Sequence, residues 1–225
     1  DLYKTSIFRG GAFQQNLVLE WIKGVATENY EEQLQTIISH PKKDYLYNST
    51  SLFMKTGPNF GNVSVPALHV GGWYDTFQQG TLDGYMGYNE ESQAQGKQLL
   101  IMTPSTHGMP REGKIGNLTF PTTNYNGFNL YLDWEQKLLD HVLFGKPFDW
   151  SGNRVAYYLM GDVDDKNVDA NEYRFAEDWP VPYENNIWYL NSTSVIGLSN
   201  GTRPSSNLNY SYLFDPRNPV PTVGG

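Results

Sequence analysis

The chain has 225 residues, of which 39% are hydrophobic and 15% aromatic, and its 16 basic and 24 acidic residues give a net charge of −8. This aromatic content predicts a folded protein, because disordered chains are poor in aromatic residues. An acidic chain without a basic stripe is a poor partner for nucleic acid or an anionic membrane surface, so we expect neither. No run of residues approaches the roughly 20 apolar positions of a membrane-spanning helix. The absence of cysteine excludes disulfides and thiolate metal sites.

Two features bear on the origin of the chain. It begins with Asp1 and stops within a Gly-Gly pair, so we expect both ends to be cut from a longer protein. Sequons of the form N-x-[ST] are frequent, and with the low charge they favour an extracellular or secreted protein; chance in a chain rich in Asn, Ser and Thr is the alternative. The sequons begin at Asn48, Asn62, Asn117, Asn191, Asn200 and Asn209.

Apolar spacing in the first two thirds of the chain predicts alternating strands and helices. Two helices come first, then two short buried runs that read as strands, each followed by a helix. The last helix has the clearest face and ends at Gly145 and Pro147, in the order expected for a helix end. A strand–helix–strand–helix order predicts a parallel sheet of the α/β class. The expected helices are 12–23, 29–38, 78–93 and 125–144, and the expected strands are 65–70 and 98–103.

The pattern changes after Pro147. Segments 153–160, 186–190 and 208–214 are short and aromatic-rich, and clusters of Asp, Asn, Gly and Pro separate them. Such segments are typical of a β-sandwich or jelly roll. We therefore expect a domain boundary near residue 149.

Two polar residues follow the two predicted strands. Asp75 comes after strand 65–70 and His107 after strand 98–103. Because the carboxyl ends of parallel strands meet at one edge of a sheet, both side chains are expected at the same edge. A carboxylate beside an imidazole fixes the tautomer of a general base, and acid before histidine is the order in α/β-hydrolases. The alternative is that Asp75 caps a helix and His107 is an ordinary loop histidine.

A nucleophile is harder to find. We expect no G-x-S-x-G elbow anywhere in the chain, because Ser51, Ser64, Ser92 and Ser105 lack the flanking glycines that its strained turn requires. No cysteine can replace the serine. Either the chain is not an esterase-like enzyme, or the serine lies upstream of residue 1.

Several motifs, in order, carry a family resemblance. The sequence VPALHVGGWYD at 65–75 resembles the catalytic-acid segment of the X-Pro dipeptidyl-peptidase, cocaine esterase and α-amino acid ester hydrolase family, and TPSTHG at 103–108 resembles its catalytic-histidine segment. Four further stretches agree with the same family. These are GGAF at 10–13, His40-Pro41 followed by Asp44, LLDHVLFG at 138–145, and Asp215-Pro216 followed by PVPTVGG at 219–225.

The resemblance implies the C-terminal half of an α/β-hydrolase domain with part of a helical cap, followed by a partial β-sandwich (jelly roll). Residues 1–148 would form the hydrolase part, with the cap at about 1–60 and the last strands and helices of the sheet at 61–148, and residues 149–225 would begin the jelly roll. It also implies that Asp75 orients His107, and that His107 activates a serine upstream of this chain. The fragment alone is then expected to be inactive.

The sequence departs from the family at two points. Ser105-Thr106 stands where the family has a tryptophan before the histidine, which changes a pocket wall. Asp44-Tyr45 stands where the family often has two adjacent acids, so a strong preference for α-amino substrates is not supported.

Remaining candidates have a functional and a structural interpretation. Trp73 and Phe77 flank Asp75 and are candidates for an acyl pocket, although aromatic residues near strand ends are more often core. Asp44 is a candidate substrate contact, although acids in turns are usually solvated. A metal site of His69, Asp75 and His107 lacks ligand spacing, so we expect no metal and no cofactor.

The leading hypothesis is a serine hydrolase that cleaves a small-molecule ester, an amide or a short peptide, as an X-Pro dipeptidyl-peptidase, esterase or acylase. Homo-oligomer formation is left open. The alternative hypothesis is a non-catalytic module whose β domain binds carbohydrate or a partner on a degenerate hydrolase scaffold.

Overall fold

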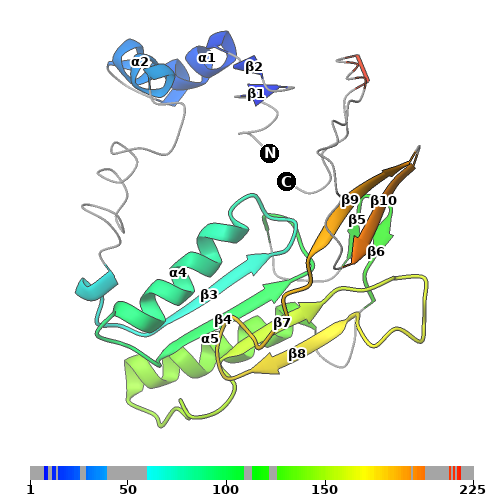
Figure 1. The fold of residues 1–225 in the computed structure, drawn as a ribbon. Coiled ribbons are helices and arrows are strands. Elements are labelled where there is room, and N and C mark those ends of the chain that lie inside the picture. Colours follow the sequence, from blue (N-terminus) through cyan, green and yellow to red (C-terminus); the bar gives the residue numbers. More distant parts are fainter. Residues whose placement is uncertain are drawn as a thin grey trace. The chain divides into compact units, whose positions relative to one another are not determined.

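The structure is a computed structural model. It describes residues 8–9, 12–13, 15–25, 29–39, 60–108, 113–121, 126–193, 195–200, 213, 215 and 217–218 (Figure 1). The chain forms two compact units, Asp1–Trp179 with Pro221–Gly225, and Pro180–Val220.

The N-terminal elements are two short paired strands and two helices. Strands β1 (Phe8–Arg9) and β2 (Ala12–Phe13) pair antiparallel, and helices α1 (Gln15–Val25) and α2 (Tyr30–Ser39) follow. The helices pack through Val18, Ile22 and Leu34, which are all buried. Both helices were predicted, and α1 begins later than expected because Ala12 and Phe13 are in a strand.

A four-stranded sheet is the centre of the first unit. After a short 3-10 turn, η2 (Phe60–Asn62), the chain forms β3 (Ala67–Gly72), α4 (Gln78–Glu91), β4 (Gln98–Thr103), α5 (Gly127–Phe144), β7 (Val155–Leu159) and β8 (Glu172–Ala176). The strand order is β3-β4-β7-β8; β3, β4 and β7 are parallel, and β8 is antiparallel to β7. This is a mixed α/β fold with a mostly parallel sheet, as the strand–helix–strand order predicted.

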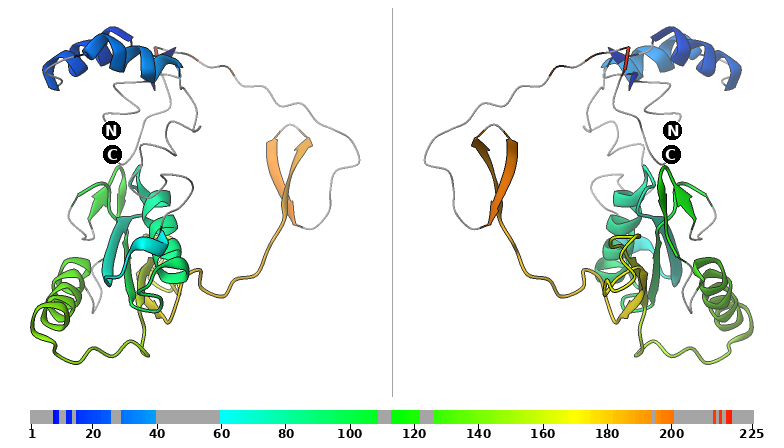
Figure 2. Two further views of the ribbon diagram at one scale, coloured as in Figure 1. Left: turned by 90° about the vertical axis from the view of Figure 1, so that its left-hand side faces the viewer. Right: turned by 90° about the vertical axis from the view of Figure 1, so that its right-hand side faces the viewer.

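Helices α4 and α5 cover opposite faces of this sheet (Figure 2). All six residues of β4 are buried, because a strand in the middle of a covered sheet has no face toward water. Successive side chains alternate between the faces: Ile101 belongs to the cluster with Leu130 of α5, whereas Leu100 and Met102 belong to the cluster with Leu82 of α4.

Helix α5 has well-defined ends. The side chain of Asn126 accepts hydrogen bonds from the backbone N–H groups of Phe128 and Asn129, which satisfies the first turn. At the other end Gly145 has a φ of 66°, the left-handed conformation in which glycine closes a helix. The predicted helix 125–144 is thus present with nearly the expected bounds.

The structure differs from the expectation at residues 153–160. These residues form β7, which pairs parallel to β4 and so continues the α/β sheet, and β8 follows it. The expected boundary near 149 lies inside the first compact unit, which extends to Trp179. Alternating aromatic residues indicate a strand but not its neighbour, because a half-buried strand has the same pattern in a sandwich and at the border of an α/β sheet.

Two hairpins complete the described elements. Strands β5 (Lys114–Ile115) and β6 (Leu118–Thr119) pair antiparallel with each other, and they lie between β4 and α5 in the sequence. In the second unit, β9 (Trp188–Thr193) pairs antiparallel with β10 (Val195–Asn200). The predicted strand 186–190 overlaps β9, β10 was not predicted, and the predicted strand 208–214 lies outside the described residues apart from Leu213.

Candidate active site

Asp75 lies in the turn between β3 and α4. Its Oδ1 accepts a hydrogen bond of 2.9 Å from the backbone N–H of Phe77, and its own N–H donates to Gly72 O at 3.1 Å. The side chain is only 9% exposed. These contacts hold one carboxylate oxygen to the backbone, and the second oxygen is available to another partner.

That partner is His107, in the loop after β4. His107 Nδ1 lies 3.0 Å from Asp75 Oδ2, within hydrogen-bonding distance. The structure therefore brings together the two residues that the strand ends predicted to be neighbours. The imidazole is 64% exposed, whereas the carboxylate is largely covered, so a buried acid holds an open histidine.

Backbone contacts tie the two loops together. The N–H of Trp73 donates to Thr103 O at 2.8 Å, and the N–H of Tyr74 donates to Ser105 O at 3.1 Å. Gly72 lies so close to the other loop that a Cβ there would fall 2.1 Å from Ser105 O. The sequence pattern does not predict these loop contacts; the change from apolar to polar residues at the end of β4 is its one related signal.

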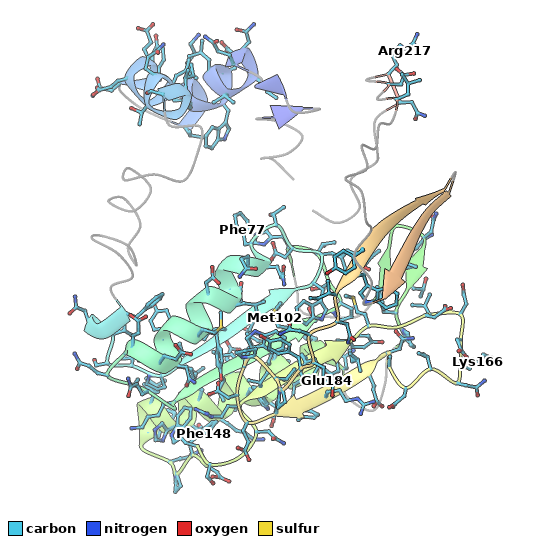
Figure 3. The ribbon with its side chains drawn as sticks, viewed as in Figure 1. Phe77, Met102, Phe148, Lys166, Glu184 and Arg217 are labelled. Atoms are coloured by element: carbon cyan, nitrogen blue, oxygen red, sulfur yellow. The ribbon has the colours of Figure 1, made fainter. Side chains whose placement is uncertain are left out.

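A pocket of about 410 Å³ lies beside the pair. Phe77 also lines it, is 60% exposed, and meets the His107 ring edge-on with 5.0 Å between ring centroids. Figure 3 shows Phe77 beside the start of α4. Thus one of the two aromatic residues predicted for a pocket reaches the histidine. The lining residues are Val70, Gly71, Gly72, Asp75, Phe77, Thr81, Thr103, Ser105, Thr106, His107, Gly108 and Tyr131.

Trp73 has a different position from the one predicted. It does not line this pocket; its Nε1 donates to Tyr158 O at 2.8 Å and its ring packs on Trp179. Trp73 therefore contributes to core packing. It directly follows β3, and its side chain packs against the hydrophobic cluster that contains Leu82 of α4. Asp44 lies outside the described residues.

His69 is a packed histidine of β3. Its Nε2 lies 3.3 Å from Gln98 Oε1, and its ring contacts Tyr85 and Tyr88. Burial lowers the pKa of His69 below its ordinary value, although the bond to Gln98 acts in the opposite direction. These contacts agree with the structural interpretation of His69.

Three further features of the described residues bear on other classes of site. No group of three or more His, Asp and Glu side chains in that part of the chain is arranged to hold a metal ion. None of the helices there combines the length and apolar composition that a membrane crossing requires. A second cavity of about 450 Å³ contains Lys137 and Lys146, which are already paired with Asp133 and Asp140.

One serine does have glycines at the elbow spacing. The run Gly197-Leu198-Ser199-Asn200-Gly201 matches G-x-S-x-G in its letters. Ser199 lies in β10, opposite Tyr189 of an antiparallel hairpin, whereas an elbow joins a strand to a helix. It also follows His107 in the chain instead of preceding the acid. The match is therefore not an elbow.

The arrangement has a defined chemistry. A carboxylate that holds Nδ1 of an imidazole leaves Nε2 to take and return a proton, and α/β hydrolases place such a pair after neighbouring parallel strands to activate a serine. The fold and the pair thus resemble the acid–base half of an α/β serine hydrolase.

Comparisons with known proteins agree with this class. The family model of the X-Pro dipeptidyl-peptidase (S15 family) matches residues 9–109. Cocaine esterase from Rhodococcus sp. (strain MB1 Bresler) is 26% identical over 208 residues, which cover 85% of this chain and 32% of that protein. The chain thus spans about a third of this relative's length.

Two crystal structures of a CocE/NonD family hydrolase from Staphylococcus aureus are also similar. They match with 17% and 18% identity and a TM-score of 0.44 each, cover 76% and 86% of this chain, and are themselves covered to 27% and 31%.

The family match confirms the resemblance predicted from the sequence: residues 9–109 are similar to the X-Pro dipeptidyl-peptidase family, and the chain is similar to cocaine esterase. The family and this relative are hydrolases, and they give no support to the alternative of a non-catalytic binding module.

Proposed function

We propose that this chain supplies the acid and the base of a serine hydrolase that cleaves ester or amide acyl bonds. Asp75 is the orienting acid and His107 is the general base. The nucleophilic serine and the oxyanion hole belong to parts of the protein outside these 225 residues, and the chain by itself is expected not to turn over substrate.

The bond of 3.0 Å between Asp75 Oδ2 and His107 Nδ1 is the observation that carries this proposal. The acid is 9% exposed and the histidine 64% exposed, so the pair is anchored on its acid side and open on its histidine side. Both residues line one pocket, which supports a substrate binding there.

The proposed reaction proceeds through an acyl-enzyme. His107 Nε2 takes the hydroxyl proton of the serine as its oxygen attacks the carbonyl carbon, and Asp75 stabilises the imidazolium that forms. His107 then gives this proton to the leaving alcohol or amine. In the second half His107 takes a proton from water as the water oxygen attacks the acyl carbon, and it then gives this proton to the serine oxygen as the acid leaves.

The family resemblance also supports a finer description of the fold. We propose that residues up to about 60 form part of a helical cap and that the sheet of β3, β4, β7 and β8 belongs to an α/β-hydrolase domain. The β-sandwich, or jelly roll, then follows in the region of the β9–β10 hairpin, beyond Trp179.

The substrate class is proposed at the level of the family. The proposed substrate is a small ester, an amide or a short peptide, with an X-Pro dipeptide and a simple ester as equal candidates. Phe77 is the proposed contact for an apolar acyl group, because it is exposed beside His107. Asp44 remains a proposed substrate contact.

Two substitutions in the complete polypeptide that carries this chain test the proposal. Hydrolysis of p-nitrophenyl esters is measured for His107→Ala and Asp75→Asn. We expect His107→Ala to abolish nearly all activity, and Asp75→Asn to lower kcat by about 10⁴-fold, because the asparagine amide favours the wrong tautomer.

His141→Ala is the matched control. His141 is also hydrogen-bonded through Nδ1, to Lys146 O at 2.7 Å, but it lies in α5 and does not line the pocket. It should retain activity. Unchanged activity in His107→Ala would refute the proposal.

A further inference from the structure

Two hydroxyl groups lie between the loops that carry Asp75 and His107. Thr103 ends β4 and is fully buried, and Ser105 is 7% exposed. Thr103 Oγ1 lies 2.6 Å from Ser105 Oγ and 3.3 Å from Gly71 O, in the neighbouring strand β3. Both residues line the pocket that contains His107.

The direction of these hydrogen bonds follows from the number of protons. A hydroxyl has a single proton to donate, and Gly71 O can only accept. Thr103 therefore donates to Gly71 O, and Ser105 donates to Thr103 Oγ1. The result is a chain of two hydrogen bonds that runs from the His107 loop to the end of β3.

The backbone of the same two residues completes the connection. Thr103 O and Ser105 O accept from Trp73 and Tyr74, the two residues directly before Asp75. Each residue thus contributes a carbonyl, and the side chain of Thr103 adds one further bond to β3, which the Ser105 hydroxyl supports from within its own loop. Polar groups buried this deeply stabilise one arrangement only when they are paired, as these are.

We propose that Thr103 and Ser105 are positioning residues, whose hydroxyls set the distance between Asp75 and His107. This inference rests on the proposed function. Neither hydroxyl is assigned contact with substrate; both act through the acid–histidine pair. Loss of the Thr103 hydroxyl removes both side-chain bonds, and loss of the Ser105 hydroxyl removes the bond that supports Thr103, so in each case the pair is held less tightly while the fold remains.

The test compares Ser105→Ala, Thr103→Val and Thr103→Ser in the complete polypeptide. For the first two variants we expect kcat for p-nitrophenyl ester hydrolysis to fall by about 10- to 100-fold, because small misplacement of a catalytic group has effects of this size. KM should change less than about twofold. Thr103→Ser keeps the hydroxyl and should restore most of kcat.

Ser92→Ala is the matched control for loss of a buried serine hydroxyl. Ser92 is 3% exposed, and its Oγ donates to Tyr88 O near the far end of α4. This variant should lower the melting temperature without lowering kcat.

A double-mutant comparison separates positioning from general stability. If the hydroxyls act through the pair, Ser105→Ala should add little to the loss already caused by Asp75→Asn. A full additional loss in that background would overturn the inference, and so would wild-type kcat in both Ser105→Ala and Thr103→Val. Failure of the proposed function is a separate result, because it appears as activity retained in His107→Ala.

Discussion

Gly72→Ala adds a single methyl group where the loops that carry Asp75 and His107 meet, and the structure predicts a large loss of activity from it. Gly72 is the last residue of β3 and is buried. An alanine Cβ would fall 2.1 Å from Ser105 O and 2.8 Å from Ser105 C, both backbone atoms. Glycine is required there because of space, since neither loop can move a side chain aside to admit the methyl group.

The size of the displacement follows from these contacts. Real Cβ atoms essentially never approach other heavy atoms closer than 3.0 Å, so Ser105 must shift by about 0.9 Å. If the His107 loop moves with Ser105, the bond of 3.0 Å between Asp75 and His107 lengthens to about 3.9 Å, beyond hydrogen-bonding distance. A misplacement near 1 Å can lower the rate about 100-fold, and we expect kcat/KM to fall by that order.

The assay is p-nitrophenyl ester hydrolysis by the complete polypeptide, together with its melting temperature. Gly80→Ala is the control, because Gly80 is exposed in α4 and a Cβ there would meet nothing within 4 Å. Gly80→Ala should keep full activity and gain slightly in stability, since alanine is the better helix former. Wild-type activity in Gly72→Ala would refute the close approach of the two loops and the role assigned to it.

Two further predictions concern the pocket and the core. Phe77→Ala should raise KM several-fold for esters with an aromatic acyl group and leave the melting temperature nearly unchanged, because Phe77 is 60% exposed in the pocket. KM for acetyl esters should stay near the wild-type value. If KM for aromatic acyl esters is the same in the variant as in the wild type, Phe77 does not contact the acyl group. Burial lowers the pKa of His69, so below its ordinary pKa of 6.5 the unfolded chain binds more protons than the folded chain, and stability falls with acidification. Between pH 7.5 and 5.5, the urea midpoint should therefore fall more in the wild type than in His69→Gln, and parallel pH profiles would show that His69 contributes nothing.

The sequence predicted much of the sheet because its apolar patterns were unambiguous. The run 98–103 is wholly apolar in its middle and matches β4. The segment 125–144 has one apolar face and is followed by Gly145, and it matches α5. Asp75 and His107 could be expected to meet because parallel strands end at one edge, and the two loops after β3 and β4 bring them to 3.0 Å.

Other features depend on contacts that a single sequence does not encode. The aromatic segment 153–160 was predicted as a strand, but its partner β4 is chosen by tertiary packing. Trp73 and Phe77 both flank Asp75, and only the turn geometry decides that Phe77 is in the pocket and Trp73 is in the core. The hydroxyl bonds of Thr103 and Ser105 join residues that no local pattern relates.

The position of β3 has a consequence for handling the protein. β3 is at one end of the strand order, and in the described part of the chain only β4 pairs with it. A recombinant piece limited to residues 60–179 would present the outer row of β3 amide and carbonyl groups to solvent, between half-buried apolar side chains such as Leu68 and Val70. Strand edges of this kind pair readily with one another and cause aggregation.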